Sequence, residues 1–276
     1  MSDLQCLFPT LGFLGAGNMA TAIIRATVGR GLLAPETVQI LDVVPEKTQQ
    51  LHQELNVQIA ADPAALARSV SALVLAVKPQ TMDAALASLR DAVNENHLVI
   101  SIAAGIPAGR IARGLRNRAR VVRVMPNTPA LIGCGAAGVA AGPGAGERDV
   151  AAVTQLFGAM GIAVPVAEEQ LDAVTALSGS GPAYVFRVME ILREAGEEMG
   201  LARDISHALT LQTVLGAARL ASESGEDPAV LRQRVTSPGG TTEAALGKFD
   251  ELNLAGVFKA GVHRARDRSR ELAGHD

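Results

Sequence analysis

The sequence predicts an α/β domain followed by an all-α carboxyl-terminal domain. Short apolar runs of strand length alternate with helical stretches through the first part of the chain, and a glycine-rich turn follows the first of these runs. After about residue 166 the strand patterns end and long helical patterns follow one another. We therefore expect an α/β domain at 1–166 and a helical domain at 167–276.

Composition argues against several classes of protein. The chain has 276 residues, enough for two domains, and the apolar run 73–77 is stopped by Lys78 and Pro79, so no run reaches membrane-spanning length. A net charge of -3 with both signs interspersed gives no basic face for nucleic acid. Cys6 and Cys134 lack CxxC spacing and a nearby histidine, so we expect no disulfide framework and no metal site. With no secretory signal visible, these features predict a cytoplasmic location.

The first domain opens with a buried strand and a glycine-rich turn. The strand is expected at Leu11–Leu14, and 12–20 reads GFLGAGNMA, a GxGxxA pattern that opens a helix. Gly15 allows the tight turn, Gly17 lets the backbone approach a pyrophosphate, and Ala20 allows close helix packing. The strand before the pattern and the helix after it favour a dinucleotide-binding Rossmann domain over a tight turn without a cofactor.

An acidic residue follows the second expected strand, Val38–Leu41. This residue, Asp42, is placed for a ribose hydroxyl, and an acid here favours NAD, whereas the 2′-phosphate of NADP calls for cations. Lys47 is the only cation nearby, and it fits a solvated helix charge equally well. The residues alone leave the choice between NAD and NADP open.

Two polar residues follow later strands. The continuous apolar run 72–77 is typical of a buried parallel strand, and Lys78 follows it, where ligands lie in an open parallel sheet. Lys78 fits either a ligand contact or a solvated strand-end charge. After the strand expected at 120–124, two prolines hold a loop rigid around Asn127, whose amide fits a cofactor or substrate contact or an Asx-type turn.

The helical domain contains a turn that could bind a small anion. Its sequence is SPGGTT, and we expect Ser237 to cap a helix that has Pro238 at its first position. The N–H groups of residues 239–241 would then face a carboxylate, with the hydroxyl of Thr242 one residue on. A plain Ser-Pro helix cap with a glycine hinge is the alternative. The surrounding helices, expected at 171–178, 183–199, 203–222 and 254–272, are apolar without a sheet to cover, so they bury one another or a partner subunit.

The side-chain inventory favours a reaction that needs no strong protein acid. The few histidines form no nucleophile or metal motif, and no GxSxG sequence is present. Hydroxyls are available at Thr175, Ser178 and Ser180, as well as near the SPGGTT turn. Hydride transfer to a C=N bond fits this inventory, because an imine can enter already protonated.

Five blocks of sequence together resemble the pyrroline-5-carboxylate reductase family over nearly the whole chain. They are 12–19, 76–79, 125–129, 171–184 and 237–242. The resemblance implies a Rossmann domain and a helical domain that interlocks with its twin in a dimer, with further assembly, commonly to a decamer. It also implies a reaction, in which the reduced cofactor transfers a hydride to 1-pyrroline-5-carboxylate and gives L-proline. The cofactor would be NADP, which is the commoner one in the family, or NAD.

The resemblance implies site residues as well. The cofactor would be held by Gly12, Leu14, Gly15, Ala16, Gly17, Asn18, Met19 and Asp42, with Ala76, Val77, Lys78, Pro79 and Asn127 toward the nicotinamide. The substrate would be held by Gly239, Gly240, Thr241 and Thr175, with Thr242 bonding the ring nitrogen and Ser178 and Ser180 completing the catalytic pocket. The family often has Asn where Pro63 stands and Arg or Asn after the acid at Asp42, so the NADP preference stays open.

Two other functions fit the layout less well. The first is a 3-hydroxyacid dehydrogenase with the same layout, which needs a catalytic lysine on the first helix of the second domain. The helix expected at 171–178 has no lysine. The next cations, Arg187 and Arg193, are poorly suited to act as bases. A nucleotide-sensing scaffold would bind cofactor without turnover and gives no reason for the SPGGTT turn. We therefore expect an imine reductase.

Overall fold

The computed structural model describes residues 3–274, and the chain forms two compact units. The first unit consists of the residues up to Ser180 together with those from Ala265 onward, and the second unit is Gly181–Arg264. The domain limits predicted from the sequence, 1–166 and 167–276, place the change of fold earlier in the chain, and they stay a prediction.

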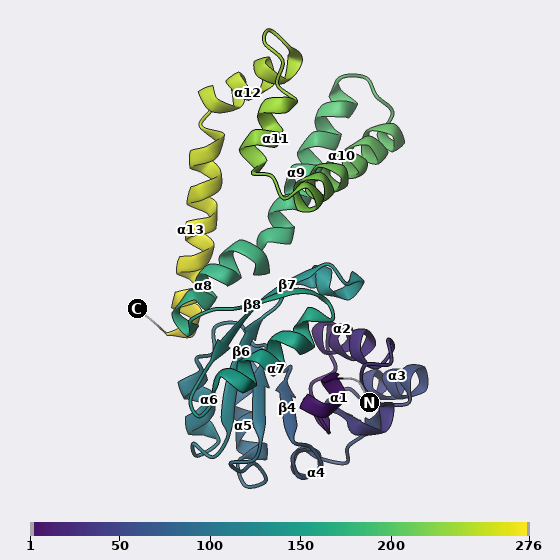
Figure 1. Cartoon of the computed structure of the whole chain (residues 1–276), viewed down its shortest axis with the longest axis vertical. Coiled ribbons are helices and arrows are strands. Elements are labelled where there is room, and N and C mark those ends of the chain that lie inside the picture. The colour runs from purple at the N-terminus through teal and green to yellow at the C-terminus, as the bar shows by residue number, and fades with distance from the viewer. Residues whose placement is uncertain (1–2, 275–276) are drawn as a thin grey trace. The chain divides into compact units, whose positions relative to one another are not determined.

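An eight-stranded sheet forms the centre of the first unit, in the order β3-β2-β1-β4-β5-β6-β7-β8 (Figure 1). Its strands are β1 (Leu11–Leu14), β2 (Val38–Leu41), β3 (Gln58–Ile59), β4 (Ala72–Leu75), β5 (Leu98–Ser101), β6 (Arg120–Met125), β7 (Gly135–Ala141) and β8 (Gly161–Pro165). Neighbouring strands are parallel except β6 and β7. The order reverses at β1, which pairs with β2 and β4, and this is the switch point of a Rossmann sheet. The predicted α/β fold is confirmed.

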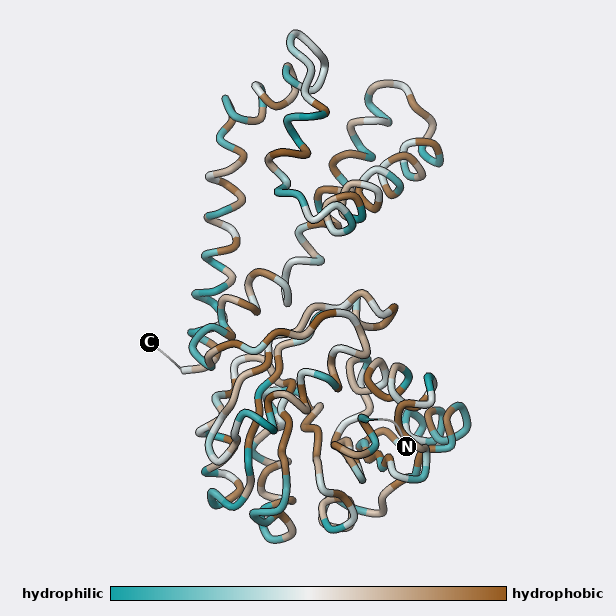
Figure 2. The backbone as a smooth tube through the Cα atoms, viewed as in Figure 1, coloured by the Kyte–Doolittle hydropathy of each residue, from teal (hydrophilic) through white to brown (hydrophobic). Residues whose placement is uncertain are grey.

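Helices cover both faces of this sheet. They are α1 (Asp3–Leu7), α2 (Asn18–Thr27), α3 (Pro45–Leu55), α4 (Pro63–Ser69), α5 (Met82–Leu89), α6 (Ala108–Gly114), α7 (Glu147–Gly158) and α8 (Leu171–Val174). One apolar cluster includes residues of α1, α2, α3 and α7, and a second includes residues of α4, α5 and α6. Figure 2 shows the apolar residues concentrated along the strands between these layers. Strands buried on both faces explain why the sequence reads as continuous apolar runs.

The helix predicted at 171–178 has a different form. After the single turn of α8, residues Thr175–Gly179 form a π-helix, with wider backbone turns than an α-helix. A Cβ added at Gly179 would lie 2.6 Å from the Cε atom of Met125, so this segment packs directly against the end of β6. π-helical turns are frequent at functional sites, and this one contains two of the predicted pocket residues.

The second unit is helical throughout. It contains α9 (Gly181–Glu198), α10 (Arg203–Ser224), α11 (Pro228–Arg234), α12 (Thr241–Glu251) and the first part of α13 (Leu254–Ala273). α9 and α10 pack closely where Gly196 faces Ser206, since a Cβ on that glycine would lie 2.7 Å from the serine Oγ. Large apolar side chains such as Phe186, Leu209 and Val257 remain exposed. The all-α prediction is confirmed, and these helices leave much of their apolar surface uncovered within one chain.

Candidate active site

The glycine-rich turn connects β1 to α2 at the carboxyl edge of the sheet. Gly15 has a φ of +104°, a conformation that side chains rarely adopt, and an added Cβ would lie 2.6 Å from the Ala76 carbonyl oxygen. Gly12 lies within β1, where an added Cβ would approach side chains of the neighbouring core, and Leu14 is buried. Gly12 and Gly15 therefore permit close packing, Ala16 is buried as well, and open space begins at Gly17.

The amino terminus of α2 is free to receive an anion. Gly17 is the N-cap with extended backbone, no side chain caps the helix, and a Cβ added there would meet no atom within 4 Å. The first intrahelical bond is donated by the Thr21 N–H to the Gly17 carbonyl at 2.9 Å, so the amides of residues 18–20 come before it. Unpaired amides at a helix amino terminus with open space in front suit the pyrophosphate of a dinucleotide.

Asp42 follows β2, and its carboxylate holds the glycine-rich turn by accepting backbone N–H groups. Its Oδ2 accepts the N–H of Ala16 at 2.6 Å and its Oδ1 accepts the N–H of Val44 at 2.9 Å. The Nζ of Lys47 lies 3.9 Å from Oδ1, and the aspartate side chain is only 10% exposed. Each carboxylate oxygen still has a lone pair for a hydroxyl donor, so the predicted ribose contact remains compatible with these bonds.

Ala76, Val77, Lys78 and Pro79 lie directly beyond β4, at the same edge of the sheet as the glycine-rich turn. Lys78 is exposed, and its carbonyl oxygen accepts the N–H and the hydroxyl of Thr81, both at 3.0 Å, which begins a short 3-10 turn at Pro79–Thr81. The structure thus places these residues beside the Gly15 turn. Whether Lys78 contacts a ligand stays a prediction.

Asn127 is 8% exposed and its amide joins three segments of the first unit. Its Nδ2 donates to the Ser178 carbonyl at 3.1 Å, and its Oδ1 accepts the N–H of Ala136 at 2.9 Å. The Asx-type turn considered from the sequence would use a residue two positions on, so that alternative is wrong. The amide ties the loop after β6 to β7 and to the π-helix.

The predicted pocket hydroxyls lie on or next to the π-helix. Thr175 donates its hydroxyl to the Leu171 carbonyl at 2.7 Å, and Ser178 donates to the Val174 carbonyl at 3.0 Å. The N–H of Ser180 donates to the Thr175 carbonyl at 2.8 Å. Because the two hydroxyl protons are already committed, Thr175 and Ser178 have acceptor capacity left for a ligand.

The SPGG turn differs from its predicted geometry. α12 begins at Thr241 with Gly240 as N-cap, so the predicted cap Ser237 and first helical residue Pro238 lie before the helix. Pro238 and Gly239 instead hold the central positions of a β-turn, with a φ of +70° at Gly239. The N–H of Gly240 closes it by donating to the Ser237 carbonyl at 3.0 Å. A proline followed by a glycine at positive φ is typical of a type II turn, and this turn replaces the expected cap.

Sequence reasoning missed Glu243, which contacts this turn. The N–H of Gly239 donates to its Oε2 at 2.7 Å, so a carboxylate already lies on one of the predicted anion-binding amides. The first backbone bond of α12 runs from the Ala244 N–H to the Gly240 carbonyl at 3.1 Å, so the amides of residues 241–243 precede it. No clear signal in the sequence indicated this contact, because Glu243 has the spacing of a capping box only from Gly240, whereas Ser237 was the predicted N-cap.

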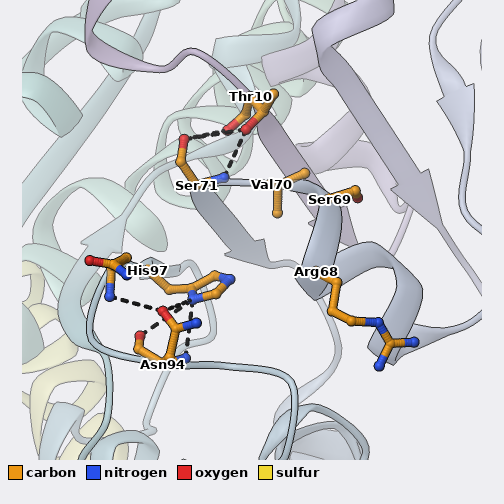
Figure 3. Close-up of a pocket in the computed structure, with 8 residues that line it drawn as sticks. Thr10, Arg68, Ser69, Val70, Ser71, Asn94 and His97 are labelled. Atoms are coloured by element: carbon orange, nitrogen blue, oxygen red, sulfur yellow. Dashed lines mark hydrogen bonds between the residues drawn. The ribbon is translucent and has the colours of Figure 1, made fainter.

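A shallow cavity of about 330 Å³ lies at the opposite edge of the sheet, where strands begin (Figure 3). His97, 6% exposed, precedes β5, and its Nε2 lies 2.9 Å from the Ala67 carbonyl oxygen while Nδ1 lies 3.1 Å from the Asn94 amide nitrogen. The hydroxyl oxygen of Thr10 accepts the N–H of Ser71 at 2.8 Å. These polar groups satisfy one another and join the starts of the strands, which indicates a structural role.

Within residues 3–274 no three His, Cys, Asp or Glu side chains gather in a way that could hold a metal ion. In the same part of the chain, no helix combines the length and the apolar character needed to cross a membrane.

Two family models match this chain. One described as pyrroline-5-carboxylate reductase dimerisation matches residues 168–272, and one described as NADP oxidoreductase, coenzyme F420-dependent, matches residues 10–105. The first match covers the helices with exposed apolar faces, and together these observations indicate a homo-oligomer.

Relatives and solved structures match nearly the full length. A pyrroline-5-carboxylate reductase of Methanosarcina acetivorans is 40% identical over 95% of this chain and 97% of its own. The structure of a pyrroline-5-carboxylate reductase from Coxiella burnetii has a TM-score of 0.91 at 36% identity, covering 96% of this chain and 98% of that one. A Plasmodium falciparum pyrroline carboxylate reductase with NADP bound has a TM-score of 0.84 at 28% identity, with the same coverage. The chain belongs to the pyrroline-5-carboxylate reductase family.

Proposed function

We propose that this chain reduces 1-pyrroline-5-carboxylate to L-proline as an NAD(P)H-dependent oxidoreductase. The observation that carries the proposal is the 40% identity to a pyrroline-5-carboxylate reductase over 95% of the chain. The uncapped amino terminus of α2 and the SPGG turn supply the two anion-binding elements that a dinucleotide and a small acid require.

NADP is the cofactor that we propose, with NAD as the alternative. The matched NADP oxidoreductase model and the NADP bound to the Plasmodium relative support it. The amides of residues 18–20 would hold the pyrophosphate, and Asp42 would keep the turn in shape while accepting ribose hydroxyls. Ala76, Val77, Lys78, Pro79 and Asn127 would lie toward the nicotinamide, which supplies the hydride when bound.

The proposed substrate site uses amides for the carboxylate and hydroxyls for the ring nitrogen. The amides of Gly239 and Thr241 would hold the carboxylate, since the Gly240 N–H already donates to the Ser237 carbonyl, and Thr242 would bond the ring nitrogen. Thr175, Ser178 and Ser180 would complete the pocket. Since Thr175 and Ser178 already donate to backbone carbonyls, their oxygens suit a protonated imine, which is itself a donor. The protein's contribution would be orientation and exclusion of water.

We also propose an assembly and a location. The exposed apolar helices support a dimer formed through α9–α13, and such dimers would assemble to a decamer. Cys6 and Cys134 are exposed and unpaired, which suits the reducing cytoplasm. Light scattering of the purified protein would give the mass of the assembly.

The activity is tested by following NADPH and NADH oxidation with 1-pyrroline-5-carboxylate. The wild type should turn over, and Thr242→Ala should lower kcat at least tenfold while the KM for NADPH stays the same, because a hydrogen bond to the protonated ring nitrogen, about 1.5–3 kcal/mol, is removed. Thr236→Ala is the matched control, since that hydroxyl donates to the Arg232 carbonyl at 2.7 Å and faces the preceding helix. Unchanged turnover in Thr242→Ala would remove this residue from the mechanism, and an inactive wild type would refute the proposed function.

A further inference from the structure

Both glycine amides of the SPGG turn already have acceptors within the chain. Gly240 donates to the Ser237 carbonyl at 3.0 Å, which closes the turn. Gly239 donates to the Oε2 of Glu243 at 2.7 Å. The Gly239 bond differs from the Gly240 bond in its acceptor. The acceptor of Gly239 is a long, exposed side chain that carries a negative charge.

We propose that Glu243 is an internal competitor for the substrate carboxylate and thereby sets the enzyme's affinity for acidic substrates. This inference rests on the proposed function, in which the Gly239 amide binds that carboxylate. Glu243 would hold the amide in the absence of substrate and leave it when substrate binds. It is a specificity-determining residue and takes no part in hydride transfer.

The position of the bond favours this role over helix capping alone. In a capping box the third residue of a helix bonds the N–H of the N-cap residue, which here is Gly240. That N–H is used by the β-turn, so the Glu243 carboxylate reaches one residue further, to Gly239. The glutamate therefore lies on the turn itself, at the place proposed for the ligand.

Charge makes the two carboxylates exclude each other. If both bound the Gly239 N–H, two negative charges would lie roughly 4–5 Å apart, where repulsion is substantial even near a protein surface. Glu243 is exposed, so it can turn into solvent when an acidic ligand arrives. The displaced bond is charge-assisted, and its loss opposes substrate binding.

Replacing Glu243 by Gln tests the inference, because Gln keeps the length and an acceptor oxygen but removes the charge. We expect the KM for 1-pyrroline-5-carboxylate to fall about threefold to tenfold, with kcat and the KM for NADPH unchanged, since a neutral acceptor competes less and no longer repels the ligand. The inhibition constant of L-proline should fall in parallel. That of L-prolinamide, which has no carboxylate, should stay the same.

Glu251→Gln is the matched control. It removes one charge from the same helix, where Glu251 pairs with Lys248 at 2.7 Å, both exposed. Steady-state kinetics of the wild type and both variants separate the possibilities. No change or a rise in KM for Glu243→Gln, an equal change for L-prolinamide, or the same change in Glu251→Gln would overturn the inference while the reductase activity stands. A wild type that does not reduce 1-pyrroline-5-carboxylate would overturn both the inference and the proposed function.

Discussion

Replacing Gly17 by Ala should weaken cofactor binding while leaving the stability of the fold nearly unchanged. Gly17 has φ of −74° and ψ of 178°, which alanine adopts without strain, and an added Cβ meets no atom within 4 Å. Alanine lowers the entropy of the unfolded chain but is a poorer N-cap than glycine, and these effects oppose each other. We expect the free energy of unfolding to change by less than about 1 kcal/mol.

The same methyl group should damage the cofactor site. It would occupy the open space in front of the amides of residues 18–20, where we propose that the pyrophosphate binds. A phosphate pushed off one amide loses a hydrogen bond to a charged group, about 1.5–3 kcal/mol. The KM for NADPH should therefore rise about tenfold to 150-fold.

Gly15→Ala is the matched comparison, because the two glycines lie in one turn and differ in their surroundings. Its φ of +104° and the 2.6 Å approach to the Ala76 carbonyl predict a fall in melting temperature of several degrees. Thermal denaturation and NADPH-dependent kinetics of both variants provide the measurements. A Gly17→Ala protein that bound NADPH like the wild type, or that melted as low as Gly15→Ala, would refute the reasoning.

Two further predictions concern the ribose end and the π-helix. Asp42→Ser should raise the ratio of kcat/KM for NADPH over NADH about threefold to tenfold, because removal of a partly buried negative charge favours a 2′-phosphate; an unchanged ratio would mean that Asp42 does not read the ribose. Asn127→Ala should lower the free energy of unfolding by about 2 kcal/mol, since the Ala136 N–H and the Ser178 carbonyl lose their partner. The same variant should lower kcat by a larger factor than that by which KM changes. If that variant were as stable as the wild type, the two hydrogen bonds of the Asn127 amide would not contribute to stability.

The sheet was predictable because burial on both faces leaves a strong trace in the sequence. A parallel strand covered by helices on both sides admits almost no polar residue, and β1, β4 and β5 are buried at every position. The glycine turn was predictable for a related reason, since the 2.6 Å approach at Gly15 admits no side chain. In both places one local constraint fixes the residue type.

The substrate turn was harder to predict because two local structures compete for the same residues. Ser-Pro at 237–238 fits the start of a helix, and Pro-Gly at 238–239 fits a type II turn. Closure of the turn by the Gly240 N–H and its continuation into α12 decide in favour of the second. Neither of these contacts is visible in the residue types alone.

The contacts of Asn127 and the form of the π-helix could not be predicted, for another reason. The amide of Asn127 bonds Ala136 and Ser178, and only the folded sheet brings these residues together. At the π-helix, Gly179 lies against Met125, where an added Cβ would be 2.6 Å from the Met125 Cε atom. Because these contacts join residues far apart in the chain, local patterns left several alternatives open.

The helices of the second unit connect assembly to activity. Among residues 181–264, all of which the structure describes, burial is confined to Gly196, Ser206 and Thr210, and none of these is a large apolar residue. A helical unit gains stability mainly by burying an amphipathic face, so this one requires a second copy to cover side chains such as Phe186 and Leu209. The SPGG turn lies in this unit and takes its shape from α12. Dissociation into single chains should therefore loosen the proposed substrate site as well as the helices, and activity should depend on protein concentration near the dissociation constant of the assembly.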